Sequence, residues 1–305
     1  MNILITGGSG FVGTYLTRQF LRHGYQVTAI GSRRSVDMPL SDDFSYVSAD
    51  TTTDGPWQGE VAKADVIINL TGKSIFGRWN DAFKKQLYDS RILSTRHIVN
   101  ALPEKSAQLL ISASAIGYYG DCADRTITEE TSAGDDFLAR LSVEWENSAL
   151  NAKTKGARVV IPRLGIVLGK NGGAVAQMVP TFKKYLGGPI GHGRQWFSWI
   201  HMEDLGSAMD FIITHREITG PVNLSAPGPV RNRDFVKALG HVLKRPASIP
   251  APTFMLRLAL GEFADTLLIS QKMLPQALQK AGFVFQYPEV AKALDNLLRT
   301  DLAET

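Results

Sequence analysis

The sequence predicts an α/β protein, with a doubly wound parallel sheet followed by a smaller C-terminal lobe. Three observations predict it. A short apolar run opens the chain and leads through a glycine-rich turn into a helical pattern; apolar runs then alternate with helical patterns as far as about Leu168; and glycines recur at Gly7, Gly10 and Gly13. Such alternation is typical of a parallel sheet covered by helices on both faces.

The first element, "NILITGGSGFVGTYLTRQFLRHG", predicts a buried strand over residues 3–6 and a helix from about Gly10 to Arg22. Gly7 permits the tight turn, Gly10 allows a close backbone approach to a pyrophosphate, and Gly13 lets the helix pack closely on the strand. Unpaired N–H groups at the helix start then favour phosphates. We therefore expect a Rossmann-type cofactor site, with contacts from Gly7, Gly10, Phe11, Val12 and Gly13.

The second strand, "YQVTAI", indicates which dinucleotide binds. A site selective for NAD carries an acid about 20 residues past the glycines, to hold the ribose 2′-hydroxyl. Here Ser32, Arg33 and Arg34 follow the strand, and no acid occurs before Asp37. A hydroxyl and guanidinium groups suit a 2′-phosphate, so NADP(H) is expected rather than NAD(H). A solvated basic turn is the alternative interpretation.

Two further segments predict cofactor contacts. "YVSAD" predicts a third strand ending at Asp50, whose carboxylate is expected to accept a hydrogen bond from the adenine amino group. "ADVIINLTG" predicts a fourth strand that runs into Leu70, Thr71 and Gly72. Because parallel strands end at one edge of the sheet, these residues are expected to lie beside the glycine-rich turn.

The composition excludes several partners. The chain has 305 residues and a formal net charge of +4, yet no run of Lys or Arg exceeds two, so no nucleic-acid partner is expected. Cys122 is the single cysteine, which suits a reducing compartment, and no apolar run approaches about 18 residues. We expect a cytoplasmic protein with no membrane partner and a small, anionic ligand. His201 and Asp204 resemble a metal pair, but no metal is expected, and the oligomeric state is left open.

The segments "GGSGFVG", "INLTG", "ISASAIGYYG", "PRLGIVLG" and "WFSWIHMEDL" resemble the extended short-chain dehydrogenase/reductases of the nucleotide-sugar epimerase type. "GGPIGHGRQWFSWIHMEDL", "GPVNLSAPGPVRNRDF" and "KMLPQALQKAGFVFQYP" are similar to an atypical branch, the epimerase family proteins related to human short-chain dehydrogenase/reductase family 39U member 1. The resemblance implies an NADP(H)-binding Rossmann domain over residues 1–169, with 196–226 returning to the sheet, and a smaller substrate lobe mainly over 170–305. It also implies a cofactor contact by Arg163.

Ordinary members of this superfamily carry a Tyr and, four residues later, a Lys on one helix face, where the ammonium lowers the Tyr pKa. The corresponding helix is expected to begin near Asp136, which sets Leu138 and Ser142 in the two slots, or Phe137 and Leu141 if the register slides by one. None of the eight tyrosines has Lys four residues later. The usual catalytic pair is therefore predicted to be missing.

Three residues are the candidates for catalysis. Ser114 matches the family's Ser, Tyr118 lies just beyond it, and Arg91 is expected in the slot of the family's Asn. Lys73 and Arg78 stand near enough in sequence to clamp an anion with Arg91. Two functions follow: an NADP(H)-dependent epimerase-like or reductase-like enzyme with a non-standard site, or a non-catalytic NADP(H)-binding sensor. The Pro-rich "RPASIPAPTFMLRLALGEFADTLL" segment is expected to form a helix whose apolar stripe packs internally.

Overall fold

A parallel sheet forms the centre of the protein. The computed structural model describes residues 1–38, 41–170 and 172–298. Within them, strands run in the order β12-β8-β5-β4-β1-β2-β3, and a short strand, β6, also pairs with β8. Every pairing in the sheet is parallel. The strands are β1 (Asn2–Thr6), β2 (Gln26–Gly31), β3 (Phe44–Ser48), β4 (Val66–Asn69), β5 (Leu109–Ser112), β6 (Ser114–Ala115), β8 (Arg158–Leu164) and β12 (Gly220–Leu224).

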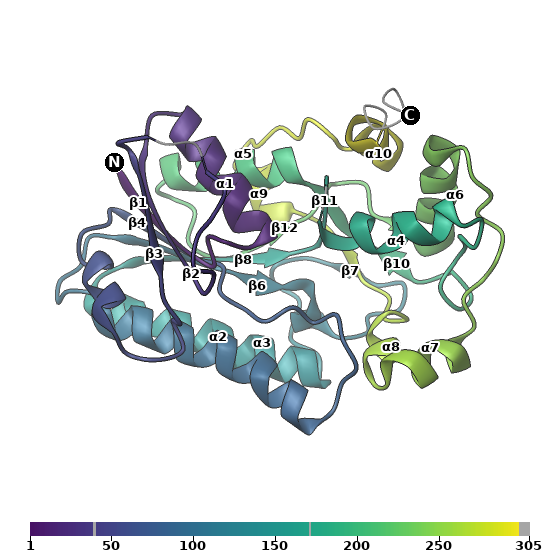
Figure 1. Cartoon of the computed structure of the whole chain (residues 1–305), viewed down its shortest axis with the longest axis horizontal. Helices are drawn as coiled ribbons and strands as arrows, with labels where there is room; N and C mark the ends of the chain where they lie inside the picture. Colours follow the sequence, from purple (N-terminus) through teal and green to yellow (C-terminus); the bar gives the residue numbers. More distant parts are fainter. Residues whose placement is uncertain (39–40, 171, 299–305) are drawn as a thin grey trace.

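Helices cover both faces of this sheet (Figure 1). On one face, Ile3 and Ile5 pack with residues of α1, α5 and α9; on the other, Leu4 packs with residues of α2 and α3. The strands inside the sheet are buried on both sides, as a doubly wound sheet requires, whereas the edge strand β3 is only partly buried. The expected Rossmann-type fold is confirmed. The helices are α1 (Phe11–Arg22), α2 (Asp81–Ala101), α3 (Phe137–Leu150), α5 (Met202–Thr214) and α9 (Gln276–Lys280), with 3-10 turns η1 (Pro56–Glu60), η2 (Ile116–Tyr119) and η3 (Asn151–Lys155).

A smaller lobe lies beyond the C-terminal ends of the strands (Figure 1). Three of its helices, α4, α6 and α10, pack around a separate apolar cluster that includes Phe182, Trp199 and Phe235. The lobe contains α4 (Gly173–Lys183), α6 (Asn232–Leu243), α7 (Thr253–Leu260), α8 (Phe263–Thr266) and α10 (Val290–Leu298). Three short strand pairs join it to the sheet domain: β9 (Ile166–Gly169) with β11 (Trp199–His201), β10 (Trp196–Phe197) with β13 (Val230–Arg231), and β7 (Thr126–Ile127) with β14 (Lys272–Met273).

Two expectations about this lobe need correction. Within residues 196–226 only β12 joins the main sheet, because β10 and β11 pair with β13 and β9 in separate two-stranded sheets. The stripe of α7 does not pack internally: Phe254 is 72% exposed and Leu258 is 80% exposed. Residues 171 and 299–305 of the expected lobe lie outside the described residues.

The glycine-rich turn fixes α1 against the sheet. Gly7 has a φ of 70°, in the left-handed region that favours glycine. A methyl group at Gly13 would lie 2.4 Å from the Gly7 carbonyl oxygen, so only glycine permits this approach. The structure therefore confirms the turn expected for Gly7 and the close helix packing expected for Gly13.

Replacing Gly13 by Ala is expected to lower the free energy of unfolding by about 1–3 kcal/mol, because the new methyl meets backbone atoms that cannot move aside. Gly59→Ala is the matched control, since a methyl group there meets nothing within 4 Å. Urea denaturation of both variants measures the difference. Equal stabilities would contradict the close approach of α1.

Candidate functional site

A cavity of about 680 Å³ opens at the C-terminal ends of the strands, beside the glycine-rich turn. Most of the residues expected to contact the cofactor line it, although they come from four separate segments. Those residues are Gly7, Gly10, Ser32, Arg33, Asp50, Leu70, Thr71 and Gly72. Parallel strands end at this edge, where open α/β sheets bind their ligands.

The turn at the floor of this cavity is suited to phosphate. Gly10 is the N-cap of α1 and has no side chain to cap the helix, so first-turn N–H groups are left for a ligand. A methyl group at Gly10 would meet only the Gly7 carbonyl oxygen, at 3.1 Å, and otherwise faces open space. This cradle fits the pyrophosphate of a dinucleotide.

The next residues of α1 point elsewhere. The Phe11 ring packs against the loop after β9, where a methyl at Gly172 would lie 2.1 Å from it. Val12 packs on the core of the sheet domain, beside Gly13. We therefore predict that backbone groups, rather than side chains, of Phe11, Val12 and Gly13 contact a cofactor.

The two arginines after β2 differ in position. Arg33 lines the cavity, and its side chain is exposed. The Tyr46 hydroxyl donates a hydrogen bond of 2.7 Å to the Arg33 carbonyl oxygen. Ser32 lines the cavity beside it. Arg34 is exposed but does not line this cavity. Arg33 and Ser32 are thus the better placed pair for a phosphate on the ribose.

A polar network holds the far wall of the cavity. Asn69 is fully buried: its side-chain oxygen accepts hydrogen bonds from the Thr6 hydroxyl at 2.9 Å and from Thr71 N–H at 3.2 Å. The Thr51 hydroxyl lies 2.7 Å from the Ser94 hydroxyl, and it donates a hydrogen bond of 3.4 Å to the Thr71 hydroxyl. These bonds fix the Thr71 backbone beside the glycine-rich turn.

Asp50 is exposed at the cavity rim. Its Oδ1 accepts hydrogen bonds from the Thr52 backbone N–H at 2.9 Å and from the Thr52 hydroxyl at 2.7 Å, a turn that holds the carboxylate in place. The bond to adenine expected of Asp50 stays a prediction. The other carboxylate oxygen is the one available for it.

Arg91 lies on α2 with its guanidinium stacked against the cofactor-side loop. A methyl group at Gly72 would lie 3.1 Å from Arg91 Cζ, and Cζ sits 5.2 Å from the centre of the Trp145 ring. One guanidinium nitrogen donates to the Leu87 carbonyl oxygen at 3.1 Å. Among the described acidic side chains, none forms an ion pair with it. Burial lowers the pKa of Arg91 to about 10.

Lys73 and Arg78, the other members of the expected clamp, lie in different places. Lys73 lines the cavity, with its ammonium 5.1 Å from the centre of the Phe83 ring. Arg78 is exposed and lies beside Gly261, at the turn between α7 and α8. Lys73 and Arg91 therefore flank Gly72 without Arg78.

Ser114 and Arg163 share one partner. The Ser114 hydroxyl donates to Glu146 Oε1 at 2.6 Å, and Arg163 donates to both oxygens of Glu146 at 2.8 Å. All three side chains are at least 94% buried, with exposures of 1%, 6% and 3%. Charged partners and hydrogen bonds raise the pKa of Arg163, so its charge is held by the chain itself. The cofactor contact expected of Arg163 and the catalytic role expected of Ser114 stay predictions.

Tyr119, rather than Tyr118, belongs to this network. Its hydroxyl accepts from Arg163 at 2.9 Å and donates to Asn223 at 2.6 Å, and burial raises its pKa to about 12. Tyr118 is half-buried, with its ring stacked under the Arg163 guanidinium at 3.5 Å. Tyr118 is thus the more accessible of the two phenols.

Helix α3 begins after its N-cap Asp136, as expected. Leu138 packs against Gly117, where a methyl would lie 3.1 Å from Leu138 Cβ. Ser142 is 4% exposed, and Glu146 follows it by one helical turn. Residues 138, 142 and 146 therefore occupy one face, and the absence of the usual Tyr–Lys pair from this helix stays a prediction.

Sequence reasoning missed several residues here. Ser9 and Thr51 line the cavity, and so do residues of α2, which are Gln86, Asp89 and Ser90. Ser9 stands inside the glycine motif and was detectable there. The α2 residues approach only because α2 packs on the sheet, so no local pattern marks them. Glu146 as the partner of Ser114 depends in the same way on a contact between distant segments.

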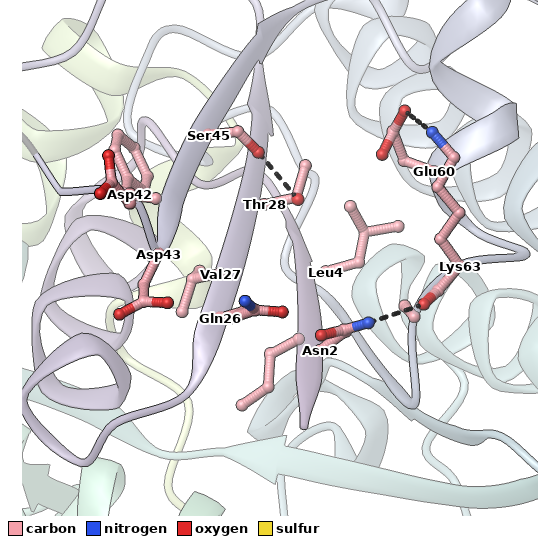
Figure 2. Close-up of a pocket in the computed structure, with 13 residues that line it drawn as sticks. Asn2, Leu4, Gln26, Val27, Thr28, Asp42, Asp43, Ser45, Glu60 and Lys63 are labelled. Carbon is pink, nitrogen blue, oxygen red and sulfur yellow. Dashed lines mark hydrogen bonds and ion pairs between the residues drawn. The ribbon is translucent and has the colours of Figure 1, made fainter.

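Two further cavities differ in character. One of about 250 Å³ lies at the opposite, N-terminal ends of β1, β2 and β3; Figure 2 shows Asp42 and Asp43 at its rim and Lys63 bound to Glu60. Another, of about 550 Å³, lies on the far side of the α1 start, between α1, α5 and α10. In the described parts of the chain, no three His, Cys, Asp or Glu side chains converge as metal ligands would.

The fold and the cavity over its glycine-rich turn define a Rossmann-type protein of the epimerase class. The family model described as "NAD dependent epimerase/dehydratase family" matches residues 3–224, and a domain of unknown function (DUF1731) matches 251–297. The chain therefore belongs to the NAD-dependent epimerase/dehydratase family.

Individual relatives agree with this assignment. The chain is 38% identical to an epimerase family protein of Mycobacterium leprae over 297 residues, covering 96% of this chain and 94% of the relative. It is 35% identical to the chloroplastic SDR39U1 homologue of Arabidopsis thaliana over 303 residues, covering 98% and 87%. The solved structure of human epimerase family protein SDR39U1 with NADPH superposes with a TM-score of 0.86 at 29% identity, covering 98% and 99%. Membership of the expected atypical branch is confirmed.

Neutralising Glu146 is expected to destabilise the fold strongly. Glu146→Gln leaves the buried Arg163 charge without a carboxylate, which should lower the free energy of unfolding by about 3 kcal/mol. Glu144→Gln, on the same helix, is the matched control: Glu144 is 43% exposed and pairs with Arg96, so a loss below about 1 kcal/mol is expected. Chemical denaturation of the two variants tests this, and similar losses would contradict the assignment of Glu146 as a buried anchor.

Proposed function

We propose that this protein binds NADP(H) and acts on, or senses, a small anionic molecule. The observation that carries the proposal is the cavity over the glycine-rich turn, which gathers Gly7, Gly10, Ser32 and Arg33 at the C-terminal edge of the sheet. Human SDR39U1, a relative of similar fold over the whole chain, was crystallised with NADPH.

Each group of residues would hold a different part of the cofactor. The first turn of α1, from Gly10, would bind the pyrophosphate through backbone N–H groups. Ser32 and Arg33 would take the 2′-phosphate, since a guanidinium binds phosphate with two hydrogen bonds. Asp50 would accept from the adenine amino group. The bound cofactor supplies hydride chemistry, and the protein supplies orientation and charge.

The anionic ligand is inferred from Arg91. A partly buried guanidinium without an acidic partner costs free energy that the fold must supply elsewhere, and such perturbed groups cluster at functional sites. Arg91 and Lys73 flank Gly72, next to the cofactor cavity. A carboxylate or phosphate there would satisfy the Arg91 donors that the chain leaves without an acid.

Catalysis would need a proton donor other than the family's Tyr, because Leu138 and Ser142 occupy the slots of the Tyr and Lys. Tyr118 is the accessible phenol, and the Arg163 guanidinium lies over its ring, with Cζ 3.5 Å from the ring centre. The Ser114 hydroxyl donates a hydrogen bond to Glu146. The role of Ser114 would therefore be to position the segment that carries Tyr118.

A non-catalytic NADP(H)-binding sensor is the second candidate. The retained cavity together with Leu138 and Ser142 on the catalytic face of α3 favours it. The two candidates are distinguished by a metabolite screen with NADPH present, followed by absorbance at the nicotinamide band. Turnover that Tyr118→Phe abolishes would support the enzyme, whereas binding without turnover would support the sensor.

NADPH is expected to bind at least about tenfold more tightly than NADH, because two charge-assisted hydrogen bonds reach the 2′-phosphate. Arg33→Ala should remove most of the preference while leaving the affinity for NADH unchanged. Arg34→Ala is the matched control, since Arg34 does not line the cavity. Fluorescence titration of the wild type and both variants with each cofactor measures these affinities. Equal binding of the two cofactors by the wild-type protein would overturn the assignment of Arg33.

Replacing Arg91 by Met is expected to stabilise the protein while weakening ligand binding. Removing a partly buried cation that has no acid partner should raise the free energy of unfolding by about 1–2 kcal/mol at pH 7. Because the pKa of Arg91 is lowered to about 10, the folded protein loses this proton before the unfolded chain does, so the gain should shrink above pH 10. Thermal denaturation at pH 7 and above pH 10 measures it, and a destabilised variant would show that Arg91 is a structural cation.

A further inference from the structure

The smaller lobe carries an apolar patch with no partner in the described chain. Six large side chains of this patch are between 47% and 80% exposed: Tyr185, Leu186, Ile249, Phe254, Met255 and Leu258. Exposed apolar patches of this kind mark interaction sites in soluble proteins. The sequence pattern had predicted burial for the part of the patch on α7.

The patch is continuous along the backbone. Ile249 N–H donates to the Gly187 carbonyl oxygen at 3.1 Å, and Ala251 N–H donates to that of Pro189 at 2.8 Å. The segments 185–191 and 249–253 therefore run side by side, and α7 follows directly from the second. Leu186 and Ile249 belong to these two segments, and Phe254, Met255 and Leu258 extend the patch along the helix.

Helix α7 is anchored, so its exposure is not the result of a detached segment. Trp79 N–H donates to the Leu260 carbonyl oxygen at 3.4 Å, and Phe263, just after the helix, packs on the Trp79 ring with centres 5.6 Å apart. None of the three cavities described above is lined by α7. Figure 1 shows α7 beside α8 at the edge of the lobe, and the helix exposes Phe254, Met255 and Leu258.

The segments that carry the patch are rich in cations and contain no acids of their own. The stretches 170–202 and 235–261 contain no Asp or Glu, and their cations are Lys170, Lys183, Lys184, Arg194, Lys237, Lys244, Arg245 and Arg257. Lys183 and Lys184 are exposed and directly precede Tyr185, and the Arg245 guanidinium lies 4.7 Å from the centre of the Tyr185 ring. The acids that follow α7 are already paired, Glu262 with Lys84 and Asp265 with Arg257.

These observations favour one occupant. A second copy docked through a twofold axis would set the same cations against one another. A peptide would need a groove, and none of the three cavities described above is lined by residues of this patch. An anionic lipid surface supplies both complements: an acyl boundary for the apolar side chains and headgroup phosphates for the cations. We propose that the patch docks this protein on anionic membrane surfaces.

The proposal concerns docking at a surface. No helix among the described residues has the length and apolar character needed to cross a bilayer. The expectation of no membrane partner rested on the lack of a long apolar run, and a short interfacial helix escapes that criterion. The patch lies apart from the cofactor cavity, so membrane docking and NADP(H) binding can fail independently.

Sedimentation with vesicles tests the proposal on the full chain. The protein is expected to co-sediment with vesicles of phosphatidylcholine mixed with phosphatidylserine, more weakly with phosphatidylcholine alone, and less at high salt. The double variant Phe254→Ser with Leu258→Ser should weaken the partitioning at least about tenfold, since two inserted side chains are lost. Lys183→Glu with Lys184→Glu should remove the preference for phosphatidylserine.

Val284→Ser is the matched control, because Val284 is an apolar residue of similar exposure, 85%, outside the patch. It should bind vesicles as the wild type does, and all variants should keep their NADPH affinity, which shows that they are folded. The proposal is overturned if the wild type does not co-sediment, or if the α7 double variant binds as well as Val284→Ser. A concentration-dependent dimer that the α7 variant loses, without vesicle binding, would assign the patch to a second copy instead.

Discussion

The close approach of α1 to the glycine-rich turn is the constraint on which the site depends. Gly13 lies so near the Gly7 carbonyl oxygen that no side chain fits at this position. This contact directs the uncapped start of α1 toward the cavity. Because β1 is flanked by β2 and β4, the same contact sets Ser32 and Arg33 on one side of the turn and Leu70 to Gly72 on the other. One backbone contact thus organises three of the segments that line the cavity.

Two arginines near this cavity are held in opposite ways. Arg163 is fully paired with Glu146 and Tyr119, so its charge supports the fold around η2. Arg91 is only partly buried and forms no ion pair with the described acids, so its charge remains available to a ligand. Pairing a buried cation stabilises a structure, and leaving one unpaired is costly unless a ligand completes it. This contrast separates the structural arginine from the candidate functional one.

The sequence predicted the fold well because periodicity is local. The strand, turn and helix at the N-terminus, and the start of α3 at Asp136, follow from patterns within a few residues. Contacts between distant segments were not predictable in this way. The Glu146 partnership of Ser114 and Arg163 spans 32 and 17 residues, and nothing adjacent in the chain indicates it.

The prediction for α7 failed for the same physical reason. An apolar stripe indicates that a helix needs a partner, but it does not say whether the partner lies within the chain. The inner side of α7 meets the Trp79 region through Leu260, which left Phe254 and Leu258 outside. Likewise, the sequence offered both Arg33 and Arg34, and the path of the chain after β2 shows that Arg33 is the one lining the cavity.

Amide hydrogen exchange with and without NADPH tests whether the cavity over the glycine-rich turn binds the cofactor, because exchange is measured for individual backbone segments. NADPH is expected to slow exchange at residues 10–13, 31–33 and 70–73, where the backbone lies at the cavity. Exchange in α7 is expected to stay the same. Protection confined to the cavity at the N-terminal ends of β1 to β3, or no protection at the glycine-rich turn, would contradict it.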